Sequence, residues 1–147
     1  MKPTTHRLLS RTVTTVLAAL SLLTASASAQ LAVTVSPPKV LGQKAVVQLG
    51  LKNTFTENIE SARAALFLVD SQGKVLGQAT QWIIGGSKDR PTLAAGTTNV
   101  FNFVVSTSKP ITATNPTVKV TFSRLVLEGG KLADPARQVS LTLEISK

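Results

Sequence analysis

The segment that decides the fold of this chain reads ARAALFLVDSQGKVLG, residues 62–77. Small or apolar residues occupy every second position of its first half, at Ala62, Ala64, Leu66 and Leu68. Successive side chains of a β-strand point to opposite faces, so this alternation predicts a strand with one face on a core. The next four residues begin with Asp70 and end with Gly73, as type I turns prefer. We therefore expect a hairpin whose second strand covers residues 75–84.

The same two-residue period recurs in short segments that are bounded by Gly, Pro, Asn or Asp. Their apolar positions are Leu31, Val33 and Val35; Val47, Leu49 and Leu51; Phe101, Phe103 and Val105; and Val118, Val120 and Phe122. Beyond residue 29, no window has the 3.6-residue apolar period of an amphipathic helix. About seven strands with turns between them predict an all-β fold, an antiparallel two-sheet sandwich of the immunoglobulin-like or fibronectin type III-like kind.

Two details of the pattern concern the last part of the chain. Apolar residues alternate with polar ones from residue 139 to 146, which predicts a half-buried strand with Leu141 and Leu143 in the core. Between residues 117 and 127 the apolar positions change from even to odd numbers. One extra residue near Ser123 and Arg124 would return both sets to the core, so we expect a β-bulge there.

Residues 1–29 have the three parts of a secretory signal peptide. Lys2, Arg7 and Arg11 precede a short apolar stretch at residues 13–25, and Ala-Ser-Ala at 27–29 is a small-residue cleavage site. The apolar stretch is shorter than the roughly 20 residues of a membrane-spanning helix. We expect cleavage before Gln30, no stable membrane anchor afterwards, and a periplasmic or secreted bacterial domain at residues 30–147.

The composition of residues 30–147 restricts the chemistry. This region has no His, Cys, Met or Tyr, so it lacks most side chains that act as nucleophiles, general bases or transition-metal ligands near neutral pH. Glu57 and Glu60 lie close in sequence, but glycoside hydrolysis needs two carboxyl groups held rigidly across a cleft. We expect no enzyme activity, no catalytic residue, no cofactor and no metal site.

The chain is basic, with a formal net charge of +9. Three of its cations lie in the signal peptide, and the remaining Lys and Arg residues are spread singly rather than in runs. Nucleic-acid binding is therefore not expected, because basic clusters and aromatic platforms are both lacking. Attraction to an anionic polymer of the envelope remains open beside the simpler interpretation of a solvated polar surface.

Residues 47–105 resemble a known domain family. They contain V-x-L-x-L-x-N at 47–53, LFLVDSQGKVLG at 66–77 and L-A-A-G-T-x-x-x-F-x-F at 93–103. This pattern, over about half of residues 30–147, resembles the FxLYD-type domains of bacterial envelopes. Leu68 and Asp70 match the motif, whereas Leu66 and Val69 stand in place of its Phe and Tyr. The resemblance implies an immunoglobulin-like sandwich and brings no catalytic residue.

Three residues are candidates for contact with a ligand or partner. Trp82 could stack on a sugar ring, although a single Trp in a sandwich also serves as a core residue. Phe67 and Val69, with Ala65, would form an exposed apolar strip on the reverse of their strand, unless a loop covers them.

These observations favour one function and leave an alternative. We expect an exported, non-catalytic binding or assembly module of the cell envelope that acts by contact with an envelope or extracellular protein, through its loops or a sheet edge. The alternative is binding of a polyanion or carbohydrate through the net positive charge and Trp82.

Overall fold

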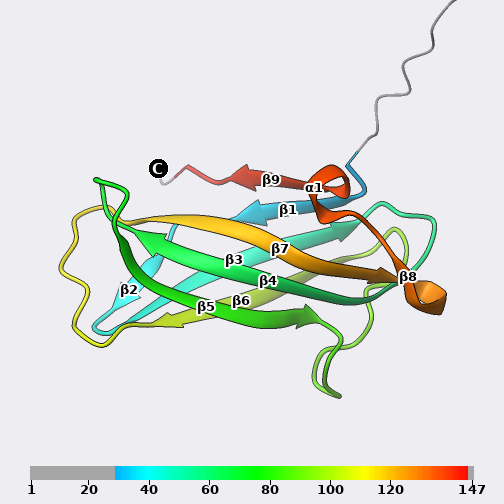
Figure 1. Cartoon of the computed structure of the whole chain (residues 1–147), viewed down its shortest axis with the longest axis horizontal. Helices are drawn as coiled ribbons and strands as arrows, with labels where there is room; N and C mark the ends of the chain where they lie inside the picture. Colours follow the sequence, from blue (N-terminus) through cyan, green and yellow to red (C-terminus); the bar gives the residue numbers. More distant parts are fainter. Residues whose placement is uncertain (1–28, 146–147) are drawn as a thin grey trace, which may run out of the picture.

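A computed structural model of the chain describes residues 29–145 (Figure 1). The predicted signal peptide lies outside the described residues, except for Ala29. The described residues form nine strands: β1 (Leu31–Val35), β2 (Lys39–Leu41), β3 (Lys44–Asn53), β4 (Ile59–Val69), β5 (Val75–Ile84), β6 (Thr98–Ser106), β7 (Thr117–Leu127), β8 (Lys131–Leu132) and β9 (Val139–Leu143). A 3-10 turn at Glu128–Gly130 precedes β8, and the one-turn helix α1 (Pro135–Gln138) precedes β9.

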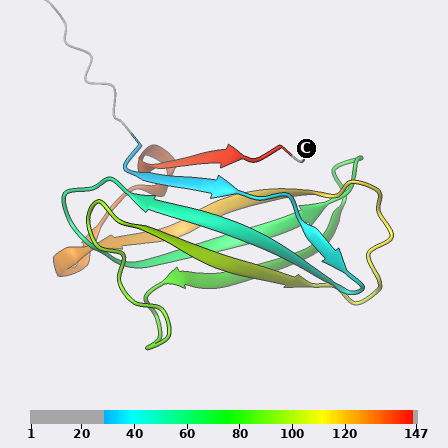
Figure 2. The ribbon, with the colours of Figure 1, turned by 180° about the vertical axis from the view of Figure 1, so that it is seen from behind.

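The strands form two sheets that pack face to face (Figures 1 and 2). In the first sheet, β1 and β2 pair with different parts of one side of β3, β6 pairs with its other side, and β9 lies outside β1. The second sheet has the order β5-β4-β7-β8. All pairs are antiparallel except β1 with β9, which are parallel. The predicted all-β, two-sheet sandwich is confirmed.

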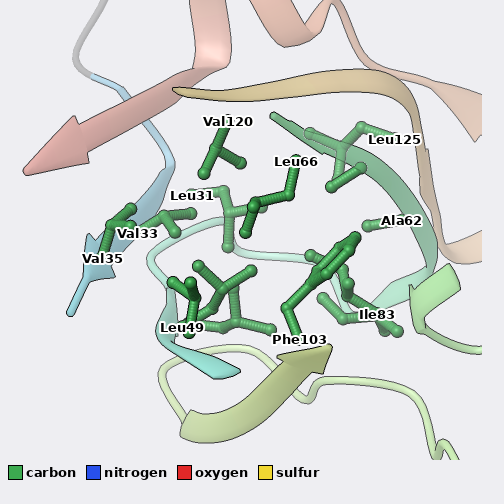
Figure 3. Close-up of a cluster of buried hydrophobic side chains, with 14 of the residues drawn as sticks. Leu31, Val33, Val35, Leu49, Ala62, Leu66, Ile83, Phe103, Val120 and Leu125 are labelled. Carbon is green, nitrogen blue, oxygen red and sulfur yellow. The ribbon is translucent and has the colours of Figure 1, made fainter. Parts of the chain in front are cut away.

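The core lies between the sheets and consists of the alternating apolar residues of both. Figure 3 shows Val33, Leu49 and Phe103 of the first sheet facing Leu66 and Leu125 of the second. These side chains are almost fully removed from solvent. Burial of this kind stabilises a fold by roughly 25 cal/mol per Å² of apolar surface. The predicted core faces of β1, β3 and β4 are confirmed, while Phe101 and Phe122 are half-buried at the margin.

The predicted turn between β4 and β5 is present. The N–H of Gly73 donates to the carbonyl of Asp70 at 3.0 Å, and the carboxylate of Asp70 accepts from the N–H groups of Gln72 and Lys74, each at 2.9 Å. Gly73 has a φ of +79°, a left-handed conformation that glycine adopts without steric cost. Asp70 therefore closes the turn through its side chain as well as its backbone.

The predicted bulge in β7 is also present. Arg63 of β4 is the Cα partner of Arg124, and the next residue, Ala64, is the partner of Phe122. Ser123 is therefore the extra residue, and its hydroxyl donates to the carbonyl of Arg63 at 3.4 Å. Val118 and Val120 precede the bulge, and Leu125 and Leu127 follow it. Because of the extra residue, all four side chains point into the same core.

The predicted burial of the last strand is wrong. Leu141 is 45% exposed and Leu143 is 61% exposed. Their parity is as expected, because they pair with the buried residues Val33 and Val35 of β1. Among the described residues, however, β9 packs extensively only against β1, so no strand of the second sheet covers its core-side face.

Asn53, at the end of β3, is a fully buried polar residue that the sequence pattern did not identify as structural. Its amide Nδ2 donates to the carbonyls of Glu57 at 3.0 Å and Leu93 at 2.9 Å. Its Oδ1 accepts from the N–H of Phe55 at 2.9 Å. One side chain thus bonds to the backbone of two loops and pairs groups of Phe55 and Glu57 that would otherwise lack these partners.

Candidate binding surfaces

The first candidate surface is the outer edge of β9. The N–H of Glu144 donates to the carbonyl of Val35 at 2.9 Å. Because successive residues of a strand direct their backbone groups to opposite sides, the N–H and C=O groups of Leu141 and Leu143 point away from β1. No strand pairs with that side among the described residues. We call this side of β9, with the exposed Leu141 and Leu143, the open edge.

The open edge lacks the features that usually protect a free strand. Val139–Leu143 contains no charged residue and no proline, and the pairing of β9 with β1 runs without a register shift. Beside it lies a cleft of about 370 Å³, where β1 and β9 end and β7 begins. The apolar side chains around this cleft are Val35, Pro37, Pro38, Pro116, Val118 and Leu143.

The opposite side of the sandwich, between β5 and β6, is closed. The amide of Gln81 on β5 donates to the carbonyl of Val104 on β6 at 3.4 Å. Gly77 of β5 is so close to the chain after β6 that a Cβ there would lie 2.7 Å from Thr107 Cγ2. The two sheets therefore meet at this side, whereas β9 at the open edge makes its main contacts with β1.

The second candidate surface is the outer face of the second sheet. Arg63 of β4 has Trp82 of β5 as its Cα partner on one side and Arg124 of β7 on the other. Its neighbours Ala62 and Ala64 are buried, so Arg63 and its two partners point outward. We call Trp82, Arg63 and Arg124 the basic row.

The position of Trp82 rules out its interpretation as a core residue. It is half-buried on the outer face and is not part of the core. The guanidinium carbon of Arg63 lies 5.9 Å from the centre of its ring. A Cβ at Gly86 would lie 2.8 Å from Trp82 Cγ, so the backbone of that glycine packs against the indole. Two neighbours therefore contact the indole, and stacking of Trp82 on a sugar stays a prediction.

The predicted apolar strip of Phe67 and Val69 is present only in part. Phe67 and Ala65 are half-buried on the outer face of β4. Val69 is only 3% exposed, so its predicted place in an exposed strip is wrong. The pairing of β4 with β5 shifts by one residue between Leu68 and Val69, and this irregularity ends the simple alternation.

The side chains of Glu57 and Glu60 both have structural partners. Glu57 forms an ion pair with Lys131 at 3.1 Å, and the carboxylate of Glu60 accepts from the N–H of Gly129 at 3.1 Å. Within residues 29–145, no group of three or more His, Cys, Asp or Glu residues could hold a metal ion. In the same range, no helix is long and apolar enough to cross a membrane.

Sequence reasoning identified Trp82 but missed Arg63 and Arg124 of the basic row, and it placed Leu141 and Leu143 in the core rather than at an open edge. The alternation around Arg63 predicts that its side chain points outward. The predicted bulge near Ser123 also allows Arg124 to point away from the core. No local signal, however, shows that Trp82 and Arg124 flank Arg63. The open edge was missed because a half-exposed edge strand and a half-buried central strand have the same alternation.

No protein-family model matches the sequence, and no curated protein matches it. One solved structure that is similar is a crystal structure of a protein provisionally named ApaA from Bordetella pertussis. It is 17% identical, with a TM-score of 0.46, and the match covers 67% of this chain and 88% of that chain. The resemblance to FxLYD-type domains therefore stays a prediction.

Proposed function

We propose that this chain is an exported, non-catalytic binding module of the cell envelope that takes up an extended segment of a partner protein at the open edge. The observation that carries the proposal is the exposure of Leu141 and Leu143 beside unpaired backbone groups of the same residues. An added strand would pair with those groups, as extended peptides do at free sheet edges.

The shape of the neighbouring cleft supports an extended partner. Leu143 lines the cleft together with Val35 and Val118, which also belong to the core. Alternate side chains of a strand paired with β9 would point toward this cleft and cover the two exposed leucines. Burial of apolar surface would then stabilise the complex, and the hydrogen bonds of the ladder would set its direction and register.

Site-specific photo-crosslinking in cells that produce the full chain tests this proposal. A photo-reactive residue at position 143 is compared with one at Thr142, whose side chain points to the opposite face of β9. We expect position 143 to yield one discrete crosslinked protein and position 142 to yield little of it. The yield should not fall at high salt, because apolar burial is not screened. Protein recovered from the same cells should begin at Gln30 by intact mass, as export predicts.

Each other outcome would contradict part of the proposal. Equal crosslinking at both positions would show that the open edge has no special role. A product made only of two copies of this chain would replace the partner segment with self-pairing. A recovered protein that still begins at Met1 and fractionates with membranes would overturn export.

A further inference from the structure

The outer face of the second sheet presents three rows of side chains across β5, β4 and β7. They are the basic row, a middle row of Thr80, Ala65 and Thr121, and a third row of Gln78, Phe67 and Lys119. Arg63 and Phe67 are four residues apart on β4, so the basic row and the third row are separated by about 13 Å. The face is long enough to contact several units of an extended polymer.

This face is cationic. Arg63, Arg124 and Lys119 are exposed on it, and the one carboxylate in these three strands, Glu60, accepts from the N–H of Gly129. The two ion pairs found within residues 29–145 join Lys131 to Glu57 and Arg137 to Asp134. The arginines of the basic row therefore have no carboxylate partner in the described part of the chain.

The pairing of Arg63 with Arg124 is unfavourable for the domain alone. Like charges directly opposite each other on neighbouring antiparallel strands are destabilising. The indole of Trp82 lies beside Arg63 but reaches only one of the two guanidinium groups. An anion between them would remove the repulsion, and planar guanidinium groups bind sulfate, phosphate and carboxylate with paired hydrogen bonds.

We propose that the basic row and the two rows beside it bind an acidic polysaccharide, a sugar chain that carries sulfate, phosphate or carboxylate groups. Arg63 and Arg124 bind one anionic group, and Lys119 binds another further along the chain. Thr80 and Thr121 supply hydroxyl groups for hydrogen bonds between these two ends, while Ala65 and Phe67 contact the C–H faces of the sugars. Arg63 and Gly86 already contact the indole of Trp82, so the arginines and Lys119 recognise the polymer through its anionic groups. This site shares no residue with the open edge and does not depend on it.

Binding of the protein to immobilised dextran sulfate tests the proposal, with neutral dextran as the reference polymer. The variant Arg63→Gln/Arg124→Gln is compared with Lys44→Gln/Lys52→Gln, which removes the same charge from the exposed side of β3. Loss of two charge-assisted contacts should weaken binding by about tenfold or more, whereas the lysine variant should change it by less than about threefold. The dissociation constants should rise with ionic strength for the wild-type chain.

Urea unfolding separates binding from folding. Because the two arginines repel each other, the arginine variant should unfold at the same or a higher urea concentration than the wild-type chain. A lower midpoint together with lost binding would overturn the proposal, because the arginines would then be needed for the fold. Equal weakening by the two variants, or binding to neutral dextran, would also overturn it. Single-stranded oligothymidylate bound as tightly, with the same dependence on the basic row, would replace the polysaccharide with a nucleic acid.

Discussion

At the scale of single residues, Asn53 shows how one polar side chain can organise a loop region. Its amide and carbonyl oxygen bond to the backbone of Phe55, Glu57 and Leu93, while its own backbone bonds to Gly96 and Thr97. These groups are shielded from water, so their hydrogen bonds must come from the protein. Asn53 therefore stabilises the loops that precede β4 and β6 more than its place at the end of a strand suggests.

We expect Asn53→Leu to lower the free energy of unfolding by about 2 to 5 kcal/mol, since it removes the bonds to the carbonyl of Glu57 and the N–H of Phe55 and one of the two bonds to the carbonyl of Leu93. The matched control is Asn102→Leu on the exposed face of β6, which should change stability by less than about 0.5 kcal/mol. Urea unfolding of both variants measures the difference. Similar losses for the two would show that the bonds of Asn53 contribute little.

At the scale of the element, β9 shows that alternation and burial are separate properties. Leu141 and Leu66 both occupy core-side positions of their strands, but Leu66 is covered by the opposite sheet and Leu141 is not. The free energy of removing a side chain depends on the atoms packed around it, and these are few at an uncovered edge.

Truncation of these two leucines should therefore have unequal effects. We expect Leu66→Ala to destabilise the domain by about 2 to 5 kcal/mol, through lost burial and the cavity left behind. Leu141→Ala should cost less than about 1 kcal/mol, because nearly half of the side chain already contacts water. Denaturant midpoints of the two variants decide the matter, and a large loss for Leu141→Ala would mean that β9 is covered in solution.

At the scale of the whole molecule, the sandwich is asymmetric. Its two sheets contact each other where β5 meets β6. At the other side, β9 is the edge strand of the first sheet and makes its main contacts with β1. Strands β3 and β4 each have partners on both sides along most of their length, whereas β9 has one partner. Local opening of the structure requires least free energy where buried contacts are fewest.

Amide hydrogen exchange of the isolated protein should show this asymmetry. We expect the slowest exchange in β3 and β4, which are paired on both sides, and rapid exchange at the N–H groups of Leu141 and Leu143. The N–H of Glu144 should exchange more slowly than its neighbour at 143, because it bonds to the carbonyl of Val35. Protection of Leu141 and Leu143 equal to that of Glu144 would indicate that the open edge is already occupied, for example by a second copy of the chain.

The sequence by itself determined the features that depend on neighbours along the chain. The alternation in residues 62–68 places Ala62 and Leu66 on one face, Asp70 and Gly73 make the turn, and the change of parity around Ser123 requires a bulge. In each case the responsible side chains lie within a few residues of one another, so chain geometry alone relates them.

Only the tertiary structure decided what lies beside each strand. The exposure of Leu141 depends on where the second sheet ends, and the basic row exists because β5 and β7 pair with β4 in one register. Asn53 likewise meets the carbonyl of Leu93 across 40 residues. Such contacts depend on strand pairing over long separations in sequence, and alternation with a period of two does not specify which strands become neighbours.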